Sequence, residues 1–193
     1  MNAYDFDDTI YKGDSSLHFF VFYLRKEPGL IKYLPTVIKV LSDYHKEKIQ
    51  FGDITARFGD LFEEYFTTHN VDFEQIAKEF WDKHEKRIKP FYKEIQKEDD
   101  LLITASPSFL AEEICRRIGI KHCLSTQFDI KTGKFIRACF REKKIDFLLE
   151  AYPDGQIDDF YTDSMNDKFL FPYAKRVFMV KGNKITRIKY GKT

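Results

Sequence analysis

The sequence predicts an α/β fold in which a doubly wound, Rossmann-like parallel sheet carries an inserted all-helical cap. Over residues 101–188, short apolar runs alternate with stretches of helical periodicity, which is typical of parallel strands joined by helices. Over residues 14–90, apolar residues recur at helical spacing alone. We therefore expect a core domain formed by residues 1–13 and 91–193, and a helical cap domain formed by residues 14–90.

The first part of the chain predicts one strand followed by helices. An apolar run at residues 2–6 ends in acids, and Gly13-Asp14-Ser15-Ser16 forms a turn rich in helix-capping residues. Apolar spacing then predicts helices at residues 17–24, 30–41, 52–66 and from 71 towards 90. We expect the cap to be hinged near Gly13 and Pro90.

The rest of the chain predicts strands that alternate with helices. Strands are expected at residues 101–105, 122–126, 156–162, 176–180 and 185–188, the last as an edge strand. Residues 129–138 predict a hairpin that turns at residues 131–134. Helices are expected from Ser106-Pro107 to Gly119, and over residues 142–152 and 165–173.

Composition narrows the classes of function. The 193 residues include 32 Lys and Arg against 31 Asp and Glu, a balance that favours neither nucleic acid nor a membrane surface as partner. Cys115, Cys123 and Cys139 form no CxxC pattern and are expected to be reduced thiols of a cytoplasmic protein. We expect no signal peptide before Asp5, and no apolar run is long enough to cross a bilayer.

The first strand leads into a cluster of acids, Asp5-Phe6-Asp7-Asp8-Thr9. Asp5 and Asp7 share one face of an extended chain, and a bend after the strand would bring both towards one ligand. Three like charges this close together cost free energy at neutral pH unless a cation compensates them. Hard oxygen ligands favour Mg²⁺ or Ca²⁺ in that role. The alternative interpretation is an acidic turn in which Thr9 caps a helix.

Two later strands end in residues of the same chemical kind. Ligands of open α/β sheets lie at the carboxyl ends of the strands, where this sequence places Thr104 and Ser106, and then Asp163 and Asp167. Together with Lys144 and a helix N-terminus, these groups would hold a divalent cation and a phosphoryl group. Taken singly, each has a plainer interpretation, as a helix cap, a turn residue or part of a solvated helix face.

The order and spacing of these motifs resemble those of haloacid-dehalogenase (HAD) superfamily phosphatases. The resemblance covers nearly the whole chain and indicates subfamily IB, which is similar to phosphoserine phosphatase and carries a helical cap after the first strand. The DxDx[TV] motif of the family is matched by residues 5–9. Its Ser or Thr at the end of an apolar strand is matched by Ser106, with Thr104 as the alternative.

The two remaining motifs of the family follow in the expected order. A lysine at a helix start is matched by Lys144, with Lys143 as the alternative. The acidic DxxxD turn is matched by Asp163 and Asp167, in a run that reads Thr-Asp-Ser-Met-Asn-Asp. One such motif alone would be weak evidence, whereas four in order are specific.

The resemblance implies a catalytic role for each matched residue. Asp5 would attack phosphorus to form an aspartyl-phosphate, and Asp7 would protonate the leaving oxygen and later activate water. Ser106 and Lys144 would hold phosphoryl oxygens. Thr9 would orient Asp7 through its loop.

The resemblance also implies a magnesium site. Mg²⁺ would be held by the Asp5 carboxylate, the backbone carbonyl of Asp7 and Asp163. Asn166 and Asp167 would orient the waters bound to the metal.

Departures from the family pattern concern the substrate. Phosphoserine phosphatases place a glutamate for the substrate amine where this chain has Asp14, and Arg57 is a weak match to the arginine that binds the carboxylate. Phosphoserine is therefore an alternative to a small or lipid-like phosphate ester. The aromatic residues between positions 19 and 44 form either a small core of the cap or an apolar mouth for the substrate. Monomer and homodimer both stay open.

Other classes of function remain as alternatives to a Mg²⁺-dependent phosphomonoesterase. A signalling receiver domain also carries a phospho-accepting Asp on a doubly wound sheet, but it lacks a helical insertion and places that Asp on a later strand. A module that binds phosphate esters without turnover is the third class. A phosphotransferase to a second alcohol is the nearest enzymatic relative.

Overall fold

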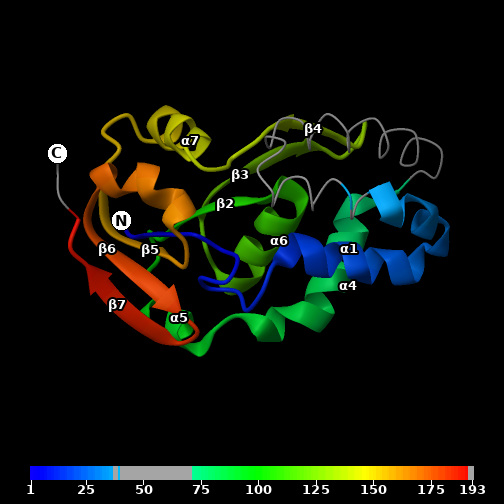
Figure 1. Ribbon diagram of the computed structural model, residues 1–193, viewed down its shortest axis with the longest axis horizontal. Helices are drawn as coiled ribbons and strands as arrows, with labels where there is room; N and C mark the ends of the chain where they lie inside the picture. Colours follow the sequence, from blue (N-terminus) through cyan, green and yellow to red (C-terminus); the bar gives the residue numbers. More distant parts are fainter. Residues whose placement is uncertain (37–38, 40–70, 191–193) are drawn as a thin grey trace.

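The sheet of the computed structural model, which describes residues 1–36, 39 and 71–190, has seven strands in the order β4-β3-β2-β1-β5-β6-β7 (Figure 1). The strands are β1 (Ala3–Tyr4), β2 (Leu101–Pro107), β3 (His122–Asp129), β4 (Lys134–Arg137), β5 (Ile157–Thr162), β6 (Ala174–Lys181) and β7 (Lys184–Ile188). The five central strands β3, β2, β1, β5 and β6 run parallel. The edge strands β4 and β7 pair antiparallel with β3 and β6. The predicted parallel α/β fold is confirmed.

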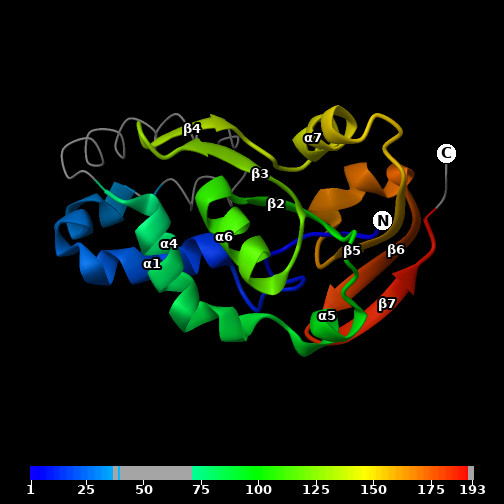
Figure 2. The same cartoon turned by 180° about the vertical axis from the view of Figure 1, so that it is seen from behind.

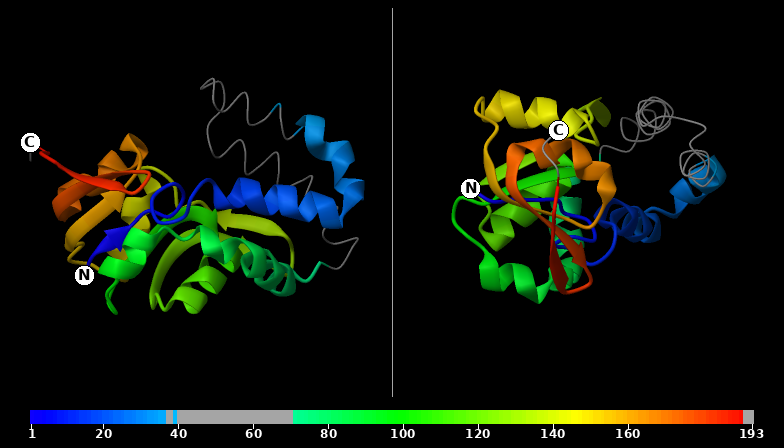
Figure 3. Two further views of the ribbon diagram at one scale, coloured as in Figure 1. Left: turned by 90° about the horizontal axis from the view of Figure 1, so that it is seen from below. Right: turned by 60° about the vertical axis from the view of Figure 1, so that its left-hand side comes forward.

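Helices connect the strands and extend the molecule to one side (Figures 1 and 2). The α-helices are α1 (Ser15–Lys26), α4 (Phe73–His84), α5 (Pro90–Ile95), α6 (Ser108–Ile118) and α7 (Lys143–Ala151), and the 3-10 helices are η1 (Pro28–Tyr33), η2 (Glu85–Arg87) and η3 (Met165–Tyr173). Figure 3 shows α1 and η1 projecting away from the end of the molecule that carries both termini. No helix in the described part of the chain combines the length and the apolar character needed to cross a membrane.

Alternate residues of the central strands belong to two hydrophobic clusters, one on each face of the sheet. Tyr4 and Leu102 belong to the cluster that includes α6, whereas Ala3 and Leu101 belong to the cluster that includes α7 and η3. Successive side chains of a strand point to opposite faces, so helices on both faces explain why these strands are apolar throughout. This arrangement is the doubly wound architecture that the sequence predicts.

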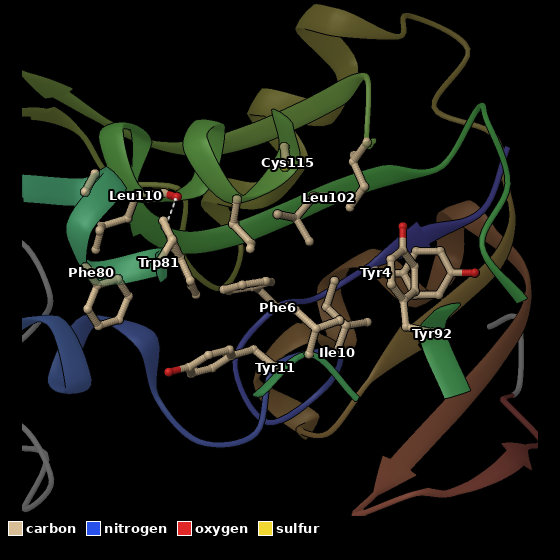
Figure 4. Packing of buried hydrophobic residues seen from close by; sticks show 14 of the residues in the cluster. Tyr4, Phe6, Ile10, Tyr11, Phe80, Trp81, Tyr92, Leu102, Leu110 and Cys115 are labelled. Carbon is tan, nitrogen blue, oxygen red and sulfur yellow. Dashed lines mark hydrogen bonds between the residues drawn. The ribbon is translucent and has the colours of Figure 1, made fainter. Parts of the chain in front are cut away.

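Aromatic residues join the inserted helices to the core (Figure 4). Trp81 of α4 is fully buried, and its Nε1–H donates a 2.9 Å hydrogen bond to the carbonyl of Leu110 in α6. Phe19 of α1 and Phe73 of α4 both contact Phe109, with ring centroids 5.3 and 5.2 Å apart. These aromatic side chains therefore pack between α6 and the helices α1 and α4, and a smaller cluster around Tyr23 and Leu30 lies beside them.

Several elements differ in detail from the prediction. Strand β1 has two residues, because the chain turns back after Asp5, although Asp5 N–H still donates to Tyr161. Residues 165–173 form a 3-10 helix rather than an α-helix, with Pro172 inside it. The helix expected from residue 71 towards 90 ends at His84, and Pro90 begins α5, in agreement with the preference of proline for the first helical turn.

Part of the predicted cap lies outside the described residues. This holds for the predicted helix over 52–66, for the end of the helix expected over 30–41, and for Arg57. The division into a core of residues 1–13 and 91–193 and a cap of residues 14–90 stays a prediction.

The contact between Trp81 of α4 and helix α6 leads to a stability prediction. Replacing Trp81 by Ala removes a fully buried ring and its hydrogen bond, so we expect the free energy of unfolding to fall by about 3–5 kcal/mol. The control is Leu17→Ala, since Leu17 is 49% exposed and its loss should cost less than about 0.5 kcal/mol. Urea denaturation followed by circular dichroism measures both, and equal effects of the two variants would contradict the packing described.

Candidate active site

Three neighbouring strands bring the predicted site residues to one edge of the sheet. Strand β1 lies between β2 and β5, with Tyr4 in register with both Leu102 and Tyr161. Asp5 directly follows β1, Asp163 directly follows β5, and Ser106 lies near the end of β2. Because the three strands are parallel, residues far apart in the sequence converge at their carboxyl ends.

A buried ammonium group joins two of the acids. Lys144 Nζ, in the first turn of α7, lies 2.7 Å from Asp5 Oδ1 and 2.7 Å from Asp167 Oδ1. The Lys144 side chain is 3% exposed and the Asp167 side chain 5% exposed. Burial alone would lower the pKa of Lys144, but the carboxylates of Asp5 and Asp167 raise it above its usual range. Lys144 is therefore a fixed cation within hydrogen-bond distance of Asp5.

The hydroxyl group of Thr9 links the ends of β1 and β5. Thr9 is fully buried, and its Oγ1 accepts a 2.8 Å hydrogen bond from the backbone N–H of Asp163. The same Oγ1 lies 3.2 Å from Asp163 Oδ1 and 3.4 Å from Asp5 Oδ2, so its one proton is available to either carboxylate. The resemblance implies that Thr9 orients Asp7 through its loop, which stays a prediction, and its hydroxyl contacts Asp5 and Asp163.

Asp7 accepts two hydrogen bonds from different parts of the chain. Its Oδ1 accepts from the backbone N–H of Ser15 at 2.6 Å, and its Oδ2 accepts from the Ser106 hydroxyl at 2.9 Å. Ser15 Oγ lies 2.8 Å from Ser106 Oγ, which extends this chain of hydrogen bonds to the start of α1. Ser106 does not cap α6, since Pro107 occupies the N-cap position without a side-chain hydrogen bond.

The three other residues expected near the substrate or metal lie at the margin of this network. Thr104 is buried, and its Oγ1 accepts from the backbone N–H of Ser106 at 3.0 Å. Asp14 is exposed and caps α1 by accepting from the N–H of Leu17 at 2.8 Å. Asn166 is exposed in the first turn of η3.

Two residues of the network had no assigned role in the sequence analysis. Ser15 was expected only as part of a capping turn, yet its N–H and hydroxyl contact Asp7 and Ser106. Lys89 is 6% exposed, and its Nζ donates to the carbonyl of Asp8, a residue with a positive φ of 52°. Lys89 lies in a run of basic residues that gives no local sign of burial, so sequence pattern alone could not single it out.

Burial changes the acidity of both carboxyl groups of the first motif. Burial raises the pKa of Asp5 to about 8, although Lys144 opposes the shift, and it raises the pKa of Asp7 to about 7 with help from the charge of Asp14. Burial also raises the pKa of Asp163, against the hydrogen bond from Thr9. The carboxyl groups of Asp5, Asp7, Asp163 and Asp167 outnumber the ammonium groups of Lys144 and Lys89 in this network, which favours a bound cation.

The donors around Asp5 fit a magnesium ion. Among the residues that the structure describes, no group of three His, Cys, Asp or Glu side chains could hold a metal. The expected set needs two carboxylates and one backbone carbonyl instead, and the carboxylates of Asp5 and Asp163 lie on either side of the Thr9 hydroxyl. All three donors are hard oxygen atoms, which Mg²⁺ prefers, and Mg²⁺ commonly takes only one or two protein carboxylates.

Comparisons with known proteins were made for the family and for the fold. A family model described as haloacid dehalogenase-like hydrolase matches residues 3–170. No significant match was found among curated proteins.

Three solved structures resemble the fold at low sequence identity. A protein of unknown function from Bordetella pertussis Tohama I has a TM-score of 0.75 and 18% identity, covering 92% of this chain and 87% of that chain. A phosphoserine phosphohydrolase-like protein from Francisella tularensis subsp. tularensis SCHU S4 has a TM-score of 0.53 and 18% identity, covering 92% and 86%. A probable phosphoserine phosphatase from Vibrio cholerae has a TM-score of 0.60 and 13% identity, covering 91% and 55%.

The raised pKa of Asp7 leads to a prediction about stability and pH. A carboxyl group with a pKa of about 7 in the folded state and 3.8 in the unfolded state destabilises the fold increasingly as pH rises between these values. Measured in EDTA, Asp7→Asn should therefore gain stability relative to wild type from pH 5 to pH 7, by up to about 1.4 kcal/mol per pH unit. Urea denaturation at the two pH values measures the difference.

The matched control for this prediction is Asp158→Asn. Hydrogen bonds from Lys175 and from the N-terminal ammonium lower the pKa of Asp158 to about 2, so its effect on stability should be constant between pH 5 and pH 7. A constant difference for Asp7→Asn as well would contradict the raised pKa.

Proposed function

The chain belongs to the haloacid dehalogenase-like hydrolase family, and on this basis we propose that it is a Mg²⁺-dependent phosphomonoesterase that forms an aspartyl-phosphate on Asp5. The observation that carries the proposal is the setting of Asp5. One of its oxygens lies 2.7 Å from the Lys144 ammonium, and the other faces the hydroxyl that also contacts Asp163. A carboxylate held in this way is oriented for attack and surrounded by groups that bind a phosphoryl dianion.

In the first half of the reaction, a carboxylate oxygen of Asp5 attacks phosphorus and the ester bond breaks. Asp7 donates its proton to the alkoxide that leaves, and a pKa of about 7 leaves Asp7 partly protonated at neutral pH. Lys144 neutralises charge on Asp5 and on the phosphoryl group, and Ser106 can turn its hydroxyl from Asp7 to a phosphoryl oxygen. The products of this step are a free alcohol and phosphorylated Asp5.

In the second half, water replaces Asp5 on phosphorus. Asp7, now a carboxylate, takes a proton from the water as it attacks, and the acyl phosphate bond breaks to restore Asp5 and release inorganic phosphate. Bound Mg²⁺ would offset the repulsion between the carboxylates and the phosphate. Asp5, Asp163 and the carbonyl of Asp7 would hold it, while Asp167 fixes Lys144 from the other side.

The proposed substrate is a small or lipid-like phosphate ester in the cytoplasm, and a nucleic acid is not proposed as a partner. Two of the solved relatives carry phosphoserine in their names, so phosphoserine is one candidate. Asp14, at the position where phosphoserine phosphatases place a glutamate for the amine, is exposed and caps α1. Its shorter side chain and this capping role give no support for phosphoserine over other esters.

Hydrolysis of p-nitrophenyl phosphate tests the proposed activity. We expect turnover that requires Mg²⁺, that EDTA abolishes, and that falls by about 10³-fold or more in Asp5→Asn because the attacking oxygen is lost. Asp146→Asn, on the exposed face of α7, is the control and should keep full activity. In Asp7→Asn the phosphorylated enzyme should accumulate, detected by intact mass after rapid quenching. Activity that survives EDTA, or an unchanged Asp5→Asn variant, would refute the proposal.

The proposed metal site has a separate test. Asp163→Asn should raise the Mg²⁺ concentration for half-maximal activity by about 10- to 100-fold, because one of two carboxylate ligands becomes a neutral amide. Asp154→Asn, in the exposed turn before β5 and therefore at the opposite end of that strand from Asp163, should leave the Mg²⁺ dependence unchanged. Titration of activity with MgCl₂ compares the variants, and overlapping curves for Asp163→Asn and wild type would place the metal elsewhere.

A further inference from the structure

An open pocket of about 610 Å³ lies beside the proposed phosphoryl site. Four parts of the chain line it: the loop after β1, the segment from η2 to the start of α5, the end of β5, and the turn between β6 and β7. Figures 1 and 2 show this last turn next to α5. Asp163, at the end of β5, forms part of its wall, so the pocket adjoins the carboxylate that we assign to the metal.

The pocket carries an excess of positive charge. Its five cationic side chains are those of Lys12, Lys86, Arg87, Lys89 and Lys181. Its carboxylates are those of Asp8 and Asp163. Within residues 1–36, 39 and 71–190, none of the five cations forms an ion pair. Uncompensated cations around a concave surface attract an anion.

Two of the cations are held in place by the fold. Arg87 donates through Nε to the carbonyl of Lys12 at 2.9 Å, and its guanidinium lies over the ring of Tyr11 at 5.8 Å from the centroid. Lys89 is 6% exposed, and its ammonium group donates to the carbonyl of Asp8. Burying an ammonium group without an ion-pair partner is costly, so its retention here indicates that a ligand or the nearby acids compensate it.

We propose that this pocket binds a second anionic group, a phosphate or a carboxylate, of the same substrate whose phosphoryl group is transferred to Asp5. The inference rests on the proposed function and narrows its substrate class to doubly anionic phosphate esters. Continuity of the two sites carries it, since the Thr9 hydroxyl that contacts Asp5 also contacts Asp163, and Asp163 lines the pocket. Lys12 and Lys181 are exposed and lie outside the phosphoryl site, so in this proposal they determine the preference for esters with a second anionic group.

The test compares esters that differ by one anionic group. Alkanediol bisphosphates of three to six carbons are assayed beside alkyl monophosphates of equal length, and p-nitrophenyl phosphate serves as a substrate with no second anion. In wild type we expect kcat/KM for the best bisphosphate to exceed that of its monophosphate by about tenfold or more, beyond the factor of two for its two equivalent ends. Lys12→Gln and Lys181→Gln should each reduce this ratio about threefold.

The control removes an equal charge from the same strand. Lys175 is exposed near the start of β6, and Lys181 ends that strand, so Lys175→Gln should leave the ratio unchanged. Turnover of p-nitrophenyl phosphate should be unchanged in all three variants, because none of these residues belongs to the phosphoryl site. Raising the salt concentration should reduce the ratio in wild type, since salt screens exposed charges.

The outcomes separate the pocket from the activity. Equal kcat/KM for both ester series in wild type, or ratios unaffected by Lys12→Gln and Lys181→Gln, would overturn the inference while leaving the phosphatase proposal intact. Absence of all hydrolysis would overturn the phosphatase proposal, and calorimetric titration with inorganic pyrophosphate then tests the pocket by itself. Binding weakened by Lys181→Gln but not by Lys175→Gln supports an anion site, whereas equal binding by all variants overturns it. If free pyrophosphate binds but bisphosphates gain nothing, the pocket serves a separate anion and the inference is wrong.

Discussion

The buried ammonium group of Lys144 is the interaction on which the rest of the site depends. It lies between Asp5, which is 139 positions away in the sequence, and Asp167, which lies in η3 after the next strand. Without that cation, the acids that converge after β1 and β5 would repel one another in a setting that excludes much of the water. The ion pair thus explains how an acidic edge can be compatible with a stable fold, and it also positions the carboxylate proposed to react.

The sheet supplies the geometry, and the aromatic cluster holds the inserted helices against it. Asp5, Ser106 and Asp163 are neighbours because β2, β1 and β5 are adjacent and parallel. Trp81 and the rings around Phe109 pack α1 and α4 against α6 on the face of the sheet that Tyr4 also faces. The start of α1 is thereby kept close enough for Ser15 to contact Asp7.

The alternation of strands and helices along the chain, the turns between them and the polar residues that follow the strands could be predicted because they leave local patterns. Apolar runs marked the strands, Gly119 and Gly133 fell at the expected ends of a helix and a hairpin, and acids followed two strands directly. Contacts that depend on tertiary packing could not be predicted in this way. The burial of Lys89 and the link from Ser15 to Ser106 depend on which segments meet in space, and a lysine in a basic run has the same local pattern whether it is exposed or buried.

The surroundings of Asp7 connect the position of α1 to the protonation of the Asp7 carboxyl group. Ser15 is the first residue of α1, and its backbone N–H is among the donors that stabilise the charged form of the Asp7 carboxyl group. Burial and the charge of Asp14, the N-cap of α1, raise the pKa of Asp7, so an outward movement of α1 would weaken these two effects together with the opposing hydrogen bond from Ser15. The position of α1 and the pKa of Asp7 are therefore coupled, so a movement that opens the carboxyl ends of the strands to a ligand also changes the protonation of Asp7.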